Sequence, residues 1–264
     1  GLVAGNQPTT FTITALDSGN ATNIGGQFTS IENLVGGINN DSFVFAGGDL
    51  SQSIDGDSGY DTLIADNEAN AFVLSGVDQG TATSLGGNFT SIENLTGNAG
   101  NDSLQVLAGA SLAGTFAGMG GVDTVTSDAA SQFLITGPNS GNATFVGGFT
   151  GVESLIGSAA VDEFWLVQGP FAGTIDGLGD NDLLRGLFVG LSVQVTGPGE
   201  GNVDGSTTFT NIEELQGSVT DDVFAFSVAG SITGTLEGDA GQDTLVGPDV
   251  STTFTVTSAD AGTM

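Results

Sequence analysis

The sequence predicts an all-β chain folded as a β-solenoid (parallel β-helix), with about 20 residues per coil and about 12 coils. Three observations predict it: a turn glycine recurs at near-constant spacing, an apolar residue recurs two positions before it, and helical periodicity is missing. Short Phe/Val/Ile/Thr runs such as residues 11–14 and 254–257, among 45 glycines in 264 residues, are typical of strands joined by tight turns.

The glycines that open successive coils recur with a nearly constant period of about 20 residues, as expected for a solenoid. They are Gly36, Gly56, Gly76, Gly97, Gly118, Gly137, Gly157, Gly177, Gly197, Gly217 and Gly238. The apolar residues two positions before a coil opening are Leu34, Ile54, Leu74, Leu95, Phe116, Ile135, Leu155, Ile175, Val195, Leu215, Leu236 and Val256. All twelve are apolar although only 38% of the chain is hydrophobic. We therefore expect this column to point into the core, with each member stacked directly on the member from the preceding coil.

A longer period lies over the first. The segment Ile31-Glu-Asn-Leu34 recurs at positions 92–95, 152–155 and 212–215, so this period is three times that of the coil. It predicts three coils per superrepeat of about 60 residues and one continuous array over residues 1–264. The superrepeats lie at roughly 16–75, 76–136, 137–196 and 197–257. We expect the array to be a window of a longer chain or a unit that stacks end to end through its open strand edges.

The composition excludes several classes of function. Cysteine is absent, so the chain has no disulfides, and Arg185 is the single basic residue in a net charge of −30. Nucleic-acid binding needs Lys and Arg to neutralise phosphates and is excluded. No apolar run approaches the roughly 18 residues of a membrane span, so membrane insertion is not expected. An acidic surface of this kind suits an extracellular location and attracts divalent cations.

Four turn segments carry a resemblance to a known family. Residues 56–63, 97–104, 118–125 and 238–245 resemble the glycine- and aspartate-rich repeats of RTX (haemolysin-type) calcium-binding proteins, and weaker copies lie at 36–43, 157–164, 177–184 and 217–224. The wider layout is similar to the repetitive arrays of large bacterial surface proteins and adhesins. Every third coil has Ala21, Thr81, Asn142 or Asn202 at the Asp position, so a continuous column of calcium ions is not expected.

The resemblance implies calcium as a ligand of the turn aspartates. In a solenoid these would stack in four pairs: Asp41 with Asp61, Asp102 with Asp123, Asp162 with Asp182, and Asp222 with Asp243. Two carboxylates about 5 Å apart repel each other, and Ca²⁺ bound by their oxygens and by turn carbonyls would remove the repulsion. The alternative is that each Asp accepts hydrogen bonds from backbone amides of its own turn. For the recurring Glu32, Glu93, Glu153 and Glu213 we expect a solvent-facing or bend-capping role.

Catalysis is not expected, because the carboxylate pairs recur four times along a rod and the chain lacks the Lys and Arg residues that would hold an acidic substrate. The predicted function is an extracellular structural one: the rigid shaft of a bacterial surface fibre or adhesin, able to assemble into filaments and stiffened by calcium. The alternative is a calcium-triggered folding and secretion module of an RTX-type exoprotein. The expected partners are the chain itself or adjoining repeats, end to end, and a surface polysaccharide is a further candidate.

Overall fold

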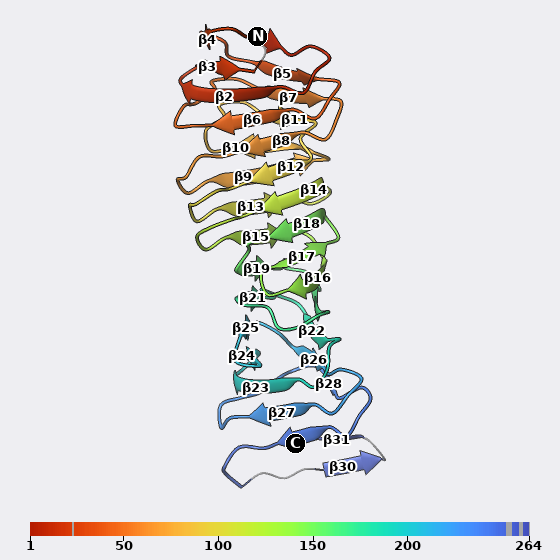
Figure 1. Cartoon of the computed structure of the whole chain (residues 1–264). Coiled ribbons are helices and arrows are strands. Elements are labelled where there is room, and N and C mark those ends of the chain that lie inside the picture. Colours follow the sequence, from red (N-terminus) through yellow and green to blue (C-terminus); the bar gives the residue numbers. More distant parts are fainter. Residues whose placement is uncertain (23, 252–254, 259–260, 264) are drawn as a thin grey trace.

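The computed structural model describes residues 1–22, 24–251, 255–258 and 261–263. They form an elongated stack of short strands, with the N-terminal strands at one end and the C-terminal strands at the other (Figure 1). The described residues contain strands and no helix, and two long sheets wind along the stack. The predicted all-β solenoid is therefore confirmed. None of the described residues form a helix with the length and hydrophobicity of a membrane span.

Two sheets form the opposite walls of the solenoid. Sheet A has 15 strands, in the spatial order β1 (Leu2–Val3), β5 (Leu34–Gly37), β7 (Ile54–Asp57), β11 (Phe89–Thr90), β10 (Gln79–Ala82), β9 (Ala71–Gly76), β13 (Ser103–Val106), β15 (Thr124–Ser127), β19 (Ser154–Ile156), β21 (Thr174–Asp176), β25 (Thr207–Thr210), β24 (Glu200–Val203), β23 (Ser192–Gly197), β27 (Val223–Phe226) and β29 (Thr244–Val246). Sheet B has 14, in the order β28 (Leu236–Glu237), β26 (Glu214–Gln216), β22 (Leu183–Gly186), β20 (Glu163–Leu166), β16 (Gln132–Gly137), β17 (Ser140–Ala143), β18 (Val146–Thr150), β14 (Leu112–Ala117), β12 (Asn94–Thr96), β8 (Thr62–Ile64), β6 (Ser42–Phe45), β2 (Thr10–Ala15), β3 (Ser18–Ala21) and β4 (Gln27–Thr29). A separate antiparallel pair joins β30 (Thr255–Ser258) to β31 (Ala261–Thr263).

Once in each superrepeat the chain folds back on itself within one sheet. Three consecutive strands then pair antiparallel, and we call this unit a hairpin triplet. The four triplets are β2 to β4, β9 to β11, β16 to β18 and β23 to β25, and they lie alternately in sheets B, A, B and A. Four single strands separate one triplet from the next and alternate between the sheets, so each superrepeat is turned by half a turn about the rod axis relative to its neighbour.

The core lies between the two sheets and is filled by alternate residues of each strand. In β6, for example, Phe43 and Phe45 are buried while their neighbours are half-exposed, which is the period-two pattern of a strand with one covered face. Stacked phenylalanines continue from strand to strand: the rings of Phe11 and Phe43 lie 5.1 Å apart and nearly parallel. A single apolar cluster runs through the described coils.

The apolar column points inward as predicted, but its stacking differs from the prediction. From Leu34 to Leu215 its members are 0 to 2% exposed, whereas Leu236 is partly buried and the side chain of Val256 lies outside the described residues. Direct pairing of consecutive members occurs once per superrepeat: Leu34 with Ile54, Leu95 with Phe116, Leu155 with Ile175, and Leu215 with Leu236.

The predicted stacking of Leu74 on Leu95 is wrong, because these residues lie in opposite sheets. Leu74 in β9 pairs with Val106 in β13, while Leu95 in β12 pairs with Leu63 and Phe116. The reason is the hairpin triplet. Its additional strands β10 and β11 lie in the chain between Leu74 and Leu95, so the distance along the chain to the next stacked strand of the same sheet is longer here. Three equal coils per superrepeat, and hence about 12 stacked coils, do not describe this fold.

Candidate functional site: a carboxylate ladder

Each Gly-to-Asp turn places the Asp side chain against the glycine five positions earlier. In all eight turns the Oδ2 atom lies within 3 Å of the point that a Cβ on this glycine would occupy. The distance is 2.6 Å from Gly157 to Asp162 and 2.8 Å from Gly36 to Asp41. Any larger residue would displace the carboxylate, so these coil-opening glycines are explained by close approach of the Asp side chain.

Each of these carboxylates accepts a hydrogen bond from a backbone amide of the adjacent coil. The amide of Asp41 donates to Oδ1 of Asp61 over 2.7 Å. The same bond joins the other predicted pairs, from Asp102 to Asp123 (2.7 Å), from Asp162 to Asp182 (2.7 Å) and from Asp222 to Asp243 (3.0 Å). The predicted neighbours are therefore adjacent, but the carboxylate of one is bonded to the amide of the other rather than facing the other carboxylate.

The bonds continue beyond each pair and form what we call a carboxylate ladder. At one end the amides of Thr9, Asn70, Ser131 and Leu191 donate to Asp41, Asp102, Asp162 and Asp222 over 2.6 to 2.7 Å. At the other end a glutamate replaces the Asp: the amides of Asp61, Asp123 and Asp182 donate to Oε2 of Glu93, Glu153 and Glu213 over 2.7 to 3.1 Å. These three glutamates therefore cap a bend, which is one of the two roles expected from the sequence.

Glu was not recognised from the sequence as a continuation of the Asp series, although a signal was present. Asp61 and Glu93 both stand two positions before the buried residue of the following strand, Leu63 and Leu95. The two acidic residues are 32 positions apart because a hairpin triplet lies between them. A period of one coil, about 20 residues, therefore does not relate Asp61 to Glu93.

The four ladders lie alternately at the starts of strands in the two sheets. The residues of the first ladder directly precede β2, β6, β8 and β12 of sheet B, and those of the second precede β9, β13, β15 and β19 of sheet A. This alternation follows from the half-turn between successive superrepeats.

The second carboxylate oxygen divides the ladder residues into two groups. In Asp162 and Asp222 it accepts a 2.6 Å hydrogen bond from the amide of Ser158 or Ser218, the residue after the coil-opening glycine, and another from that serine's hydroxyl. Among the described residues, five ladder aspartates have a buried Oδ2 with no hydrogen-bond partner: Asp41, Asp61, Asp102, Asp123 and Asp182. These five are 0 to 1% exposed.

Burial has a large electrostatic effect on these groups, because a charged carboxylate loses its hydration when it is enclosed. It raises the pKa of Asp61 to about 6, although the amide of Asp41 offsets part of the effect. It raises the pKa of Asp182 to about 7, and the nearby charges of Asp162, Glu213 and Asp180 act in the same direction. Burial also raises the pKa of Asp41, Asp102, Asp123 and Asp162.

The predicted calcium ligands do not come together as a cluster of three or more acidic side chains anywhere in the described residues. Seven of them, from Asp41 to Asp222, are at most 1% exposed, whereas Asp243 is exposed. Calcium binding by the pairs remains a prediction. What the geometry does provide is a row of hydrogen bonds from backbone amides to carboxyl oxygens, each of which holds one coil to the next.

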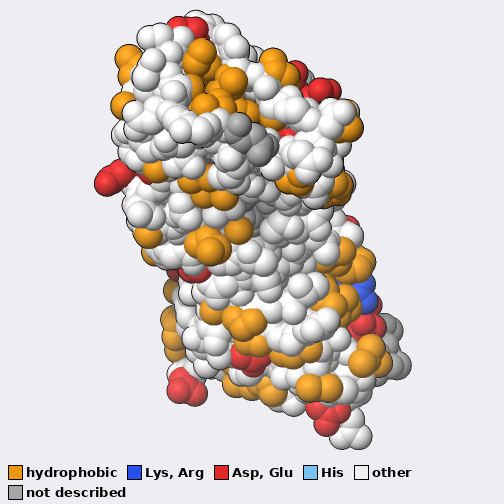
Figure 2. Space-filling view, turned by 45° about the horizontal axis from the view of Figure 1, so that its top comes forward, with side chains coloured by type: hydrophobic (Ala, Val, Ile, Leu, Met, Phe, Trp, Pro, Cys, Tyr) orange, Lys and Arg blue, Asp and Glu red, His pale blue; other side chains and the backbone are white. Residues whose placement is uncertain are grey.

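On the face shown in Figure 2, Asp and Glu side chains are spread out instead of gathered in one patch. Arg185 lies on sheet B, with its guanidinium carbon 5.3 Å from the ring centre of Trp165 and its Nη2 atom 3.4 Å from Asp239. The ion pair between Arg185 and Asp239 joins residues that are 54 positions apart in the chain.

The sequence matches no model of a known protein family and no curated protein. The likeness of its turns to RTX repeats therefore stays a prediction.

Proposed function

We propose that this chain is a structural protein: a rigid shaft of an extracellular surface fibre of a bacterium. The observation that carries the proposal is the continuity of sheet A, whose 15 strands pair in an unbroken series along the rod. Fourteen spacings of about 4.8 Å correspond to a length of roughly 67 Å. Because the interstrand hydrogen bonds run nearly parallel to the rod axis, bending or stretching the rod would strain many of them at once.

The site chemistry supports a mechanical role. The ladder carboxylates are buried and bonded to backbone amides, so they hold coils together and present little surface to a substrate. The bacterial and extracellular parts of the proposal rest on the likeness to repetitive surface proteins, on the absence of cysteine and on the net charge of −30. Further repeats or a second copy would extend the shaft by pairing with its outermost strands.

The first test is circular dichroism of the chain in EDTA, followed by titration with Ca²⁺. We expect a β-sheet spectrum and a cooperative melt without calcium, because backbone amides of adjacent coils already bind Oδ1 of the ladder aspartates. A chain that is disordered in EDTA and gains β-structure on addition of calcium would instead support the calcium-triggered folding module.

The second test is the shape of the particle. Small-angle scattering of dilute samples should give a rod about 67 Å long, and electron microscopy of concentrated samples should show filaments of constant width. Globular particles would contradict the proposed shaft, and rods that never join at any concentration would contradict end-to-end stacking of copies.

A further inference from the structure

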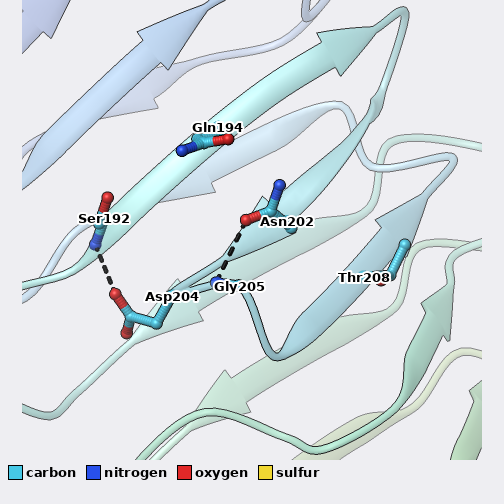
Figure 3. A pocket seen from close by; sticks show the side chains of 6 residues that line it. All are labelled: Ser192, Gln194, Asn202, Asp204, Gly205 and Thr208. Carbon is cyan, nitrogen blue, oxygen red and sulfur yellow. Dashed lines mark hydrogen bonds between the residues drawn. The ribbon is translucent and has the colours of Figure 1, made fainter.

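An open trough lies on the outer face of the fourth hairpin triplet (Figure 3). Its volume is about 590 Å³, and the residues that line it are Ser192, Gln194, Asn202, Asp204, Gly205 and Thr208. Gln194, Asn202 and Thr208 are cross-strand neighbours in one row over β23, β24 and β25. Every lining side chain is polar, and none is part of a carboxylate ladder.

The local sequence explains how the trough is built. Asp204 and Gly205 have φ values of 51° and 67° and form the two-residue turn between β24 and β25, which the amide of Ser206 closes on the carbonyl of Val203 over 3.0 Å. Asp-Gly is a preferred pair for such a turn, because both residues need positive φ. The turn fixes Asp204 at one end of the trough, where its Oδ1 accepts a 3.0 Å hydrogen bond from the amide of Ser192.

Most of the hydrogen-bonding capacity in the trough is unused. The structure shows one side-chain bond for Asp204, to the amide of Ser192, and one for Asn202, whose Oδ1 accepts from the amide of Gly205 over 3.2 Å. The Asn202 Nδ2, the Asp204 Oδ2, the Gln194 amide and the hydroxyls of Ser192 and Thr208 make no side-chain hydrogen bond within the described protein. These groups combine donors and acceptors at short range, all on one rigid sheet.

We infer that this trough binds a neutral saccharide. Each hydroxyl of a sugar both donates and accepts, so a sugar needs the mixture of amide, hydroxyl and carboxylate groups found here. The volume lies within the usual range of small-molecule sites. The site requires only the folded fourth triplet, so it is independent of fibre assembly.

Other ligand classes fit the trough less well. An anionic ligand would meet Asp204 and no cation, because Arg185 is the single basic residue and belongs to sheet B. A divalent cation would find one carboxylate, and no cluster of three acidic groups exists in the described residues. A lipid or apolar peptide would find no apolar lining side chain.

The first three triplets lack a carboxylate at the position of Asp204, although the first has a similar polar row of Thr12, Asn20 and Gln27. The position of Asp204 is Thr22, Thr83 and Thr144 in the first three triplets, and each threonine hydroxyl accepts a bond from the amide 12 positions earlier, as Asp204 does. In the second triplet the cross-strand pair that corresponds to Gln194 and Asn202 is Val73 and Thr81. A threonine at position 204 would be strained, because φ is 51° there, so glycine is the replacement that removes the carboxylate and keeps the turn.

The experiment uses the whole chain and an array of neutral oligosaccharides of glucose, galactose, mannose and N-acetylglucosamine, followed by calorimetric titration of those that bind. We expect at least one to bind with a Kd between about 0.1 and 10 mM. The triple variant Gln194→Val, Asn202→Thr, Asp204→Gly should weaken binding at least about tenfold, and Asn202→Thr alone about threefold. The control Asn20→Ala, on the outer face of the first triplet, should bind as the unmodified chain does.

Three results would overturn the inference. No neutral oligosaccharide binds at about 10 mM; the variants bind as tightly as the unmodified chain; or binding disappears in EDTA, which would assign the trough to a cation. If the triple variant does not fold, as judged by circular dichroism, the single variant and chemical-shift mapping of the bound sugar decide the question. A particle that is rod-shaped but binds no sugar would leave the shaft proposal intact.

Discussion

The backbone amide of Asp102 donates a 2.7 Å hydrogen bond to Oδ1 of Asp123, on the next coil. Two aspartates 21 positions apart are therefore joined directly, with the amide of one bonded to the carboxylate of the other. The opposite oxygen of Asp102 is buried against Gly97 and has no hydrogen-bond partner. Stability, pH response and tolerance to substitution follow from this arrangement.

The coil-opening glycines should be intolerant of even one added methyl group. In Gly157→Ala the new Cβ would lie 2.6 Å from Oδ2 of Asp162 and 2.9 Å from the carbonyl oxygen of Gly177. We expect a loss of about 1 to 3 kcal/mol in the free energy of unfolding, measured by urea denaturation. Gly179→Ala is the control, because nothing lies within 4 Å of its Cβ position, and it should be neutral or slightly stabilising. Equal losses in both variants would contradict the close-packing explanation.

The glutamates that end the ladders should differ in importance according to their contacts. Glu93 accepts a 2.7 Å bond from the amide of Asp61, whereas the described part of the chain shows no hydrogen bond to the equivalent Glu32 side chain. Glu93→Ala should lower the free energy of unfolding by about 1 to 3 kcal/mol, since the amide of Asp61 is left without a partner. Glu32→Ala should change it by less than about 0.5 kcal/mol. If thermal or urea unfolding gives the same loss for both, Glu does not act as a ladder end.

The protein should be more stable in mild acid than at alkaline pH. Burial raises the pKa of Asp61 to about 6 and the pKa of Asp182 to about 7, above the value of an unfolded chain. The folded state therefore binds these protons more tightly, and the stability they contribute is complete below about pH 4 and is lost as the pH rises through the folded values. Urea midpoints measured between about pH 4 and pH 8 should fall as the pH increases.

A matched pair of variants separates this effect from general charge repulsion. Asp182→Asn keeps the Oδ1 acceptor for the amide of Asp162 but cannot ionise, so its stability should fall less steeply with pH. Asp49→Asn removes a charge at an exposed site that is not among the charges acting on Asp182, and it should keep the steep dependence. Identical slopes for these two variants would show that burial of Asp182 is not the cause.

The strand register can be tested by cross-linking, because the chain contains no natural cysteine. Val73 in β9 and Gln105 in β13 are Cα partners across a hairpin triplet, within reach of a disulfide. The pair Val73→Cys and Gln105→Cys should oxidise to a cross-linked species that runs differently on a non-reducing gel. The pair Val73→Cys and Asn94→Cys, one predicted coil apart but in opposite sheets, should not. A cross-link in the second pair but not in the first would instead support the uniform coil predicted from the sequence.

Much of the local structure could be predicted because it depends on residues close together in the chain. The inward column from Leu34 to Leu215 follows from alternation within strands. Asp41 and Asp61 are adjacent as predicted, because no hairpin triplet lies between them in the chain. Where a hairpin triplet lies between two residues, as for Leu74 and Leu95, the predicted stacking at the spacing of one coil is wrong.

The candidate sites divide in the same way. The eight aspartates were identified from the turn pattern, and the two open possibilities were a metal pair or a bond to amides of the same turn. The structure shows the predicted same-turn bond for Asp162 and Asp222, and it adds a third arrangement, a bond from the amide of the adjacent coil. The trough over the fourth triplet was not expected, because the Asn202 position had been noted in the sequence only as a missing Asp.

By itself, the sequence determined that this chain is a β-solenoid, which residues face its core and where its turns lie, since glycine spacing and strand alternation are local physical requirements. Only the tertiary structure decided which strands pair, where the chain folds back into triplets, and that Glu93 continues the series begun by Asp41 and Asp61. The physical reason is that strand pairing is a contact between distant segments. A hairpin triplet lengthens the step along the chain, from 20 positions between Asp41 and Asp61 to 32 between Asp61 and Glu93, while the paired strands stay adjacent in space.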